Sequence, residues 1–151
     1  MPTANNEEMI KEATSHFREG FLCVESVLMT FAKYNGIRSE IIPKIATGFG
    51  AGIGRRGSLC GALTGAVMAL GLRYGRNKAD DDEAYEKCMN KSFECYMQFK
   101  KEFGSVFCNE LTECDFTTTE GLIKWRELGL KEKKCLKYVE GSMRILLNLT
   151  K

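Results

Sequence analysis

The chain has 151 residues, 44% of them hydrophobic and 28% charged, which is typical of one globular domain and excludes a disordered chain. The net charge of +2 provides no strongly basic face, so we expect no nucleic-acid partner. The longest uncharged stretch, residues 57–72, is shorter than the roughly 20 residues that a membrane-spanning helix needs. We therefore expect that the chain is not an integral membrane protein. The first ten residues lack a basic region followed by an apolar one, so we expect a cytoplasmic location.

The first half of the chain has helical periodicity. A first helix is predicted by apolar residues at three- and four-residue spacing, namely Met9, Ile10, Ala13 and Phe17. A second helix is predicted within residues 20–36, where Asn35-Gly36 is a typical C-terminal stop. A short helix should begin near Pro43. After a glycine-rich run, Ser58 should cap a helix that reaches Leu72 or Tyr74.

The second half continues this pattern. Residues 80–104 open with acids and close with lysines, which suits the dipole of one long helix. A short helix at 105–111, a threonine-rich loop, two turns at 121–129 and a final amphipathic helix at 131–151 follow. No segment of useful length alternates with period two. We therefore predict one all-α domain over residues 1–151, an orthogonal helical bundle with a glycine-rich loop before a central buried helix.

The stretch GFGAGIGRRGSLCGALTG, residues 48–65, resembles two nucleotide-binding motifs without completing either. Its G-x-G-x-x-G pattern lacks a preceding strand and a second strand ending in an acidic residue. Its G-x-x-x-x-G spacing has Ser58 where a phosphate loop needs lysine. What remains is an anion-binding loop whose amides and cations would come from Gly52, Gly54, Arg55, Arg56 and Gly57.

The same stretch also contains a packing signal. Small residues recur every four positions, at Gly57, Gly61, Gly65 and Ala69. On a helix this spacing forms one stripe, along which another backbone can approach closely. We therefore expect Gly61 and Gly65 to lie at a tight contact between helices.

Seven cysteines are unusual for a chain expected in a reducing compartment, where cysteines seldom serve as structural disulfides. We therefore expect at least some of them to perform redox or metal chemistry. Cys60 would be the second residue of the helix that Ser58 caps, and the helix N-terminus with Arg55 and Arg56 would favour its thiolate. On this basis we expect Cys60 to be the most reactive of the seven thiols. The alternative is a small thiol buried in a crowded helix contact.

The motif CGALTG, Cys60 to Gly65, resembles the C-G-A-x-x-G motif of the C_GCAxxG_C_C family of redox-active proteins. Cys23 in FLCVESVL matches the first family cysteine, while Cys108 in GSVFCNEL and Cys135 in CLKYVEG match the last two by order and context. The resemblance runs from about residue 8 to 148. It implies redox chemistry by these four cysteines and links the chain with electron-transfer proteins. Covalent c-type haem is not expected, because no C-x-x-C-H is present.

Three cysteines and the histidine remain outside this set, and the role of Cys114 stays open. Cys88, Cys95 and Cys114 lie outside the family set, and Cys88 and Cys95 are seven residues apart on one helix face, where packing is the expected role. His16, the single histidine, is expected to be a surface or packing residue.

Three functions remain open at this stage. In the first, Cys60 attacks a disulfide, and Cys23, Cys108 or Cys135 resolves the mixed disulfide. In the second, the same four cysteines hold an iron–sulfur cluster or zinc, with ligands that tertiary folding must assemble because no C-x-x-C pair is present. In the third, the protein is an interaction module with buried thiols. The partners left open are an unidentified redox protein and a second copy of the chain.

Overall fold

The computed structural model describes residues 4–151 and is all-α within them, as predicted. Its elements are α1 Ala4–Glu19, α2 Cys23–Tyr34, η1 Lys44–Phe49, α3 Gly61–Tyr74, α4 Asp82–Phe103, α5 Cys108–Thr112, α6 Thr119–Glu127, η2 Lys131–Cys135 and α7 Leu136–Leu149. Within residues 4–151 the structure has no β-strand, and its sole β-type pairing is an isolated antiparallel bridge between Leu59 and Phe107. No helix of the described chain is long and apolar enough to cross a membrane.

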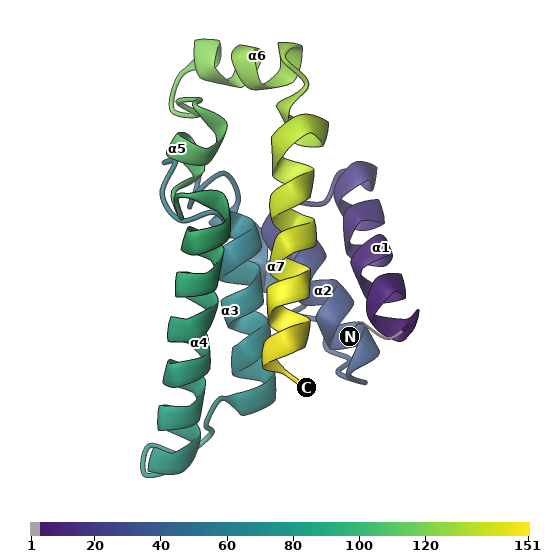
Figure 1. The fold of residues 1–151 in the computed structure, drawn as a ribbon, viewed down its shortest axis with the longest axis vertical. Helices are drawn as coiled ribbons and strands as arrows, with labels where there is room; N and C mark the ends of the chain where they lie inside the picture. Colours follow the sequence, from purple (N-terminus) through teal and green to yellow (C-terminus); the bar gives the residue numbers. More distant parts are fainter. Residues whose placement is uncertain (1–3) are drawn as a thin grey trace.

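Helix α3 is the centre of the molecule, as the sequence predicted. It packs against α2, α4 and α7, and Figure 1 shows it in the middle of the bundle. Most of its residues are buried, because alanine, leucine and glycine occur around nearly its whole circumference. Helices α3, α4 and α7 run along the long axis of the molecule, whereas α6 lies across one end.

The stripe of small residues works as expected at Gly61 and Gly65. A Cβ added to Gly61 would lie 2.5 Å from Cys23 Sγ, and one added to Gly65 would lie 2.7 Å from the carbonyl oxygen of Val24. Neither position has room for a larger side chain, so α2 and α3 approach each other almost backbone to backbone. Gly57 lies outside this contact, since it precedes the helix and has a φ of +75°.

The glycine-rich loop contains a left-handed turn. Five consecutive residues, 51–55, have φ between +51° and +71°. Three of them, Ala51, Ile53 and Arg55, are not glycines, and for a β-branched residue such as Ile53 this conformation is rare. The alternating glycines provide the positions at which positive φ costs least.

The loop is attached to α2 through a buried carboxylate. Glu25 accepts hydrogen bonds from the backbone N–H of Leu22 at 2.8 Å and from the Thr47 hydroxyl at 2.6 Å. This residue therefore joins η1 to the start of α2.

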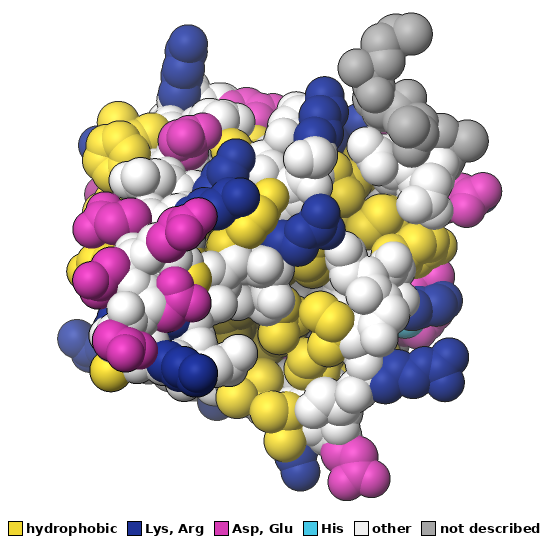
Figure 2. All heavy atoms as spheres, turned by 90° about the horizontal axis from the view of Figure 1, so that it is seen from below, with side chains coloured by type: hydrophobic (Ala, Val, Ile, Leu, Met, Phe, Trp, Pro, Cys, Tyr) yellow, Lys and Arg dark blue, Asp and Glu magenta, His cyan; other side chains and the backbone are white. Residues whose placement is uncertain are grey.

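The bundle has two different ends. Helices α2, α3 and α7 begin at one end, where α5 and α6 also lie, and we call this the thiol end. The same three helices finish at the other end, where α1 and α4 begin, and we call this the polar end. Figure 2 looks at the polar end and shows acidic side chains gathered over the start of α4, which carries Asp81, Asp82 and Glu83.

Candidate functional site

The four family cysteines all lie at the thiol end. Cys23 is the first residue of α2, Cys60 directly precedes α3, Cys108 is the first residue of α5, and Cys135 ends the π-helical segment η2 that leads into α7. Segments far apart in sequence thus deliver their cysteines to one region. π-Helical insertions of this kind occur frequently at functional sites.

A short antiparallel ladder pairs the segments that carry Cys60 and Cys108. The N–H of Cys60 donates to the carbonyl of Val106 at 2.8 Å, and the N–H of Cys108 donates to the carbonyl of Ser58 at 2.7 Å. The bridge at Leu59 and Phe107 lies between these bonds. Cys60 and Cys108 are therefore diagonal neighbours on the same face of the ladder, a relation that usually places Cβ atoms within about 7–8 Å.

Electrostatic contacts connect the remaining pairs. A negative charge on Cys60 or Cys135 would raise the pKa of Cys23, and one on Cys108 or Cys135 would raise that of Cys60, in each case after the larger effect of burial. Cys108 is affected in the same way by Cys23 and Cys135. Every pair among the four sulfurs is thus within electrostatic range. The structure brings together the four cysteines that the sequence singled out.

Burial is the dominant influence on these thiols. It raises the pKa of all four, to about 12 for Cys60 and Cys108. The N–H groups of Ala62 and Leu63 favour a thiolate at Cys60, as expected for a helix N-terminus, but burial outweighs them. The expectation of a lowered pKa at Cys60 is therefore wrong for this structure.

Two further features of the Cys60 prediction need correction. Cys60 is the residue that precedes α3, not the second residue of a helix capped by Ser58, because the ladder holds residues 58–60 extended. Its side chain is 5% exposed, and neither Arg55 nor Arg56 is among the main influences on its pKa.

Cys135 combines partial exposure with a side-chain hydrogen bond to its sulfur. Its side chain is only partly buried, and its Sγ accepts a hydrogen bond from the indole N–H of Trp125 at 3.4 Å. Burial still raises its pKa, but the Trp125 bond and the charge of Lys134 act in the opposite direction. A sulfur held by a donor and reachable from solvent is the combination that thiol exchange needs.

An apolar cavity of about 260 Å³ adjoins the cysteines. Cys23, Cys108 and Cys135 line it, whereas Cys60 does not. The charged residues that line it are Arg55 and Lys131. Most of the other lining side chains are apolar or aromatic, namely Phe17, Phe21, Leu22, Phe116, Leu122 and Trp125. The site therefore has three cysteines that line a cavity and one, Cys60, that is buried outside its lining.

Three site residues were not identified from the sequence. Cys114, whose role the sequence left open, lies close enough to Cys108 and Cys135 for its charge to raise their pKa values. Trp125 holds Cys135, and no spacing rule connects the two. Tyr138 donates to the carbonyl of Leu111 at 3.0 Å; its pKa is raised to about 12 by burial and then by the charges of Cys135, Cys60 and Cys108.

The anion-binding interpretation of the glycine loop does not agree with its hydrogen bonds. The amides of residues 53–58 donate to backbone carbonyls of residues 48–53, so the left-handed turn uses the N–H groups that an anion would need. Arg56 instead acts on Asp115, whose pKa is lowered mainly by Thr117 and to a smaller extent by Arg56. Of the loop residues predicted to bind an anion, Gly52, Gly54, Arg55, Arg56 and Gly57, only Arg55 lines the cavity.

The four thiols were also the candidate ligands for zinc or an iron–sulfur cluster. Within residues 4–151, no three His, Cys, Asp or Glu side chains are arranged to hold one metal ion. The four sulfurs are of the correct chemical type for either group. To coordinate one, their side chains would have to rotate from the positions described. His16 lies beside Glu12 and Glu19.

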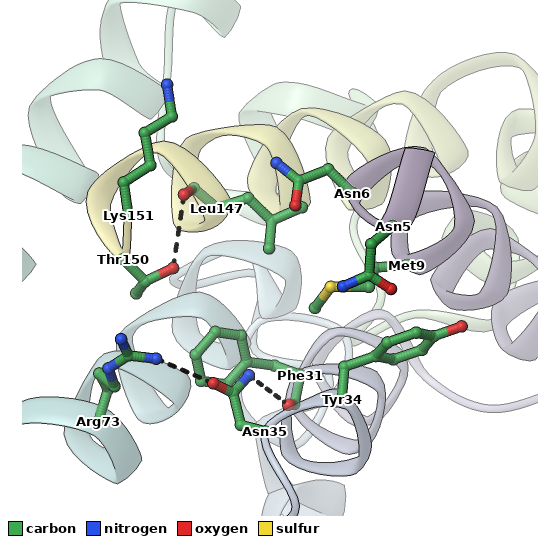
Figure 3. A pocket seen from close by; sticks show the side chains of 10 residues that line it. All are labelled: Asn5, Asn6, Met9, Phe31, Tyr34, Asn35, Arg73, Leu147, Thr150 and Lys151. Atoms are coloured by element: carbon green, nitrogen blue, oxygen red, sulfur yellow. Dashed lines mark hydrogen bonds between the residues drawn. The ribbon is translucent and has the colours of Figure 1, made fainter. Parts of the chain in front are cut away.

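Two of the other cysteines and a second cavity lie apart from this site. Cys88 and Cys95 are both within α4, and Cys95 is buried. A wider cavity of about 500 Å³ at the polar end has polar walls that include Asn5, Asn35 and Arg73 (Figure 3). Its walls come from the start of α1 and from the ends of α2, α3 and α7. A molecule bound there would lie roughly 20 Å, the length of a 14-residue helix, from the thiols.

The fold and the site together define an all-α protein with a cluster of thiols at one end. The family model described as "Putative redox-active protein (C_GCAxxG_C_C)" matches residues 21–149. The chain therefore belongs to this family, in agreement with the resemblance of its CGALTG motif. No curated protein and no solved structure matched the chain.

Proposed function

We propose that the protein carries out thiol–disulfide exchange with Cys23, Cys60, Cys108 and Cys135. The observation that carries this proposal is the convergence of these four cysteines, three of which line one cavity while the fourth, Cys60, is buried within electrostatic range of Cys108 and Cys135. Membership of a family described as redox-active supports the same chemistry. Free thiols in this number suit a reducing compartment, and we propose a cytoplasmic location.

In the proposed reaction Cys135 attacks first. It loses its proton, its sulfur forms a bond with one sulfur of a disulfide, and the other sulfur leaves as a thiolate that takes up a proton. A second cysteine of the cluster then loses its proton and attacks Cys135 Sγ, which releases the second thiol. Two protein thiols are oxidised to a disulfide and one disulfide is reduced to two thiols. Cys60, the attacking residue expected from sequence, is assigned the resolving role because it is buried and does not line the cavity.

The experiment is redox titration of anaerobically purified protein, with metal analysis and disulfide mapping by mass spectrometry. We expect a colourless, metal-free protein that loses two thiols and gains a disulfide within the family set. The Cys88→Ser variant, changed in α4, should behave as the wild type, whereas Cys135→Ser should not. Stoichiometric zinc or iron bound by the four cysteines would replace this proposal with the metal-binding function. Four thiols that stay reduced would leave an interaction module.

A further inference from the structure

The cavity at the thiol end has a composition that selects among disulfides. An apolar cavity of about 150 Å³ is enough to bind a benzene ring, so one of about 260 Å³ accommodates one substituted ring. Aromatic and aliphatic side chains form most of its wall. Such a wall favours a flat apolar group over a charged peptide, because a peptide would lose hydration without regaining hydrogen bonds.

The charged side chains on the cavity wall are both positive. Arg55 and Lys131 line it, and no aspartate or glutamate does. The Lys131 ammonium lies 4.9 Å from the centre of the Phe17 ring, which is itself part of the wall. A ligand that places a ring in the cavity and a negative charge near its rim would therefore be complementary to both features.

We propose that this cavity binds one aromatic half of a small anionic disulfide and presents its sulfur to Cys135. This inference rests on the proposed thiol–disulfide function and adds the substrate class. The reaction is the exchange described above, in which the substrate disulfide becomes two thiols and two protein thiols become one disulfide. The left-handed turn has a role in this arrangement, because it places Ala51 and Arg55 on the cavity wall.

The test compares three disulfides with the reduced protein. They are 5,5′-dithiobis(2-nitrobenzoate), which is aromatic and anionic, 2,2′-dithiodipyridine, which is aromatic and neutral, and cystamine, which is aliphatic and cationic. Each rate is divided by the rate of the same probe with N-acetylcysteine, to remove differences in intrinsic reactivity. We expect the anionic aromatic probe to have the largest ratio, roughly tenfold above the neutral one.

Variants separate charge from shape. Lys131→Gln should lower the ratio for the anionic probe roughly three- to tenfold and leave the neutral probe unchanged. Lys133→Gln, an exposed neighbour that does not line the cavity, is the matched control. Leu122→Trp, which fills the cavity, should slow both aromatic probes and spare cystamine.

The outcomes distinguish the two proposals. Equal ratios for all three probes, with a disulfide formed inside the family set, would overturn the substrate class and leave the exchange function standing. Mixed disulfides that never resolve into a disulfide of the family set would overturn the exchange function itself.

A different observation concerns the outer face of α4. Large hydrophobic side chains are exposed there at four-residue spacing, at Tyr85, Met89, Phe93 and Met97, and Phe93 is 67% exposed. Residues four apart form a continuous ridge on a helix, and such ridges pack into the grooves of another helix. An exposed ridge of this size on a monomer is typical of an interaction site.

Charges at the two ends of the ridge point to a second copy of the chain. Asp82 and Lys100 are eighteen residues apart, which is five full helical turns, so both lie on the same side of α4. At 3.6 residues per turn this is the side on which the ridge lies, and both residues are exposed. In an antiparallel pair of α4 helices, Asp82 of each copy would face Lys100 of the other. Two-fold symmetry then repeats the same contact twice.

From this self-complementary pattern we infer a homodimer formed by antiparallel α4 helices. Sedimentation velocity over a range of concentrations should show a dimer, and Phe93→Glu should make it a monomer. Asp82→Lys should weaken the dimer and Asp82→Lys combined with Lys100→Asp should restore it, because the two charges exchange places. A monomeric wild type at all concentrations, or a double variant no stronger than the single one, would overturn this inference.

Discussion

The two ends of the bundle are built from the same helices and packed in opposite ways. At the thiol end, a methyl group on Gly61 would lie 2.5 Å from Cys23 Sγ, whereas at Gly71, ten residues along the same helix, nothing lies within 4 Å. The thiol end has an apolar cavity beside four sulfurs, and the polar end has a wider one lined by amides and an arginine. Within α3, the contact with α2 is therefore tight beside Cys23 and the helix surface is open at Gly71.

Alkaline pH should reveal the largest difference between the ends. Cys60 and Cys108 have pKa values of about 12 when folded, against roughly 8.5 in an unfolded chain. The folded state keeps these protons in the interval where the unfolded state loses them. The resulting stability is complete below pH 8.5 and is lost as pH rises toward 12, by about 1.4 kcal/mol per pH unit for each thiol.

The measurement is chemical denaturation under reducing conditions between pH 8 and pH 10. In Cys60→Ala the free energy of unfolding should fall less steeply with pH, because one of the two buried thiols no longer contributes to the slope. Arg73→Ala, at the polar end, should leave it unchanged. The same slope in Cys60→Ala and the wild type would show that this thiol is not protected by burial.

A pair of glycine substitutions tests the packing contrast directly. Gly61→Ala should destabilise the protein by about 1–3 kcal/mol, because the added methyl overlaps Cys23 and Val24. Gly71→Ala should be neutral or stabilising by up to about 1 kcal/mol, because alanine favours a helix and the space is open. Thermal unfolding followed by circular dichroism measures both. Equal effects of the two variants would remove the contrast between the ends.

Within the thiol end, the Trp125 hydrogen bond should set the reactivity of Cys135. Trp125→Phe removes a donor that favours the thiolate, so the pKa of Cys135 should rise further. Alkylation of Cys135 at pH 8 should slow by up to about tenfold. Mass spectrometry can read Cys88 in the same sample as an internal control, and its rate should not change. A faster Cys135 would show that the indole shields the sulfur.

The smallest effect is expected at the polar end. Arg73→Ala removes a 3.0 Å hydrogen bond to the Asn35 side chain at an exposed position, and should change stability by less than about 0.5 kcal/mol. The disulfide-exchange rate should stay at the wild-type value in stopped-flow measurements. A slower exchange in this variant would mean that the two ends are coupled through α3.

Periodicity alone predicted the all-α fold and the buried face of the first helix. Met9, Ile10, Ala13 and Phe17 are all buried in α1, because spacing of three and four residues places them on one side of any helix. The start of α3 was misplaced at Ser58. Residues 58–60 pair with residues 106–108, and a contact between such distant segments leaves no local pattern.

The sequence singled out four cysteines, from the CGALTG motif and the order and context of the others, and the fold places all four at the thiol end. The surroundings of each sulfur were decided by tertiary structure. Burial depends on which segments cover a side chain, and this covered Cys60 and raised its pKa. Trp125 and Cys114 lie beside Cys135 because segments distant in sequence pack against the start of α7. No local sequence pattern records such a contact.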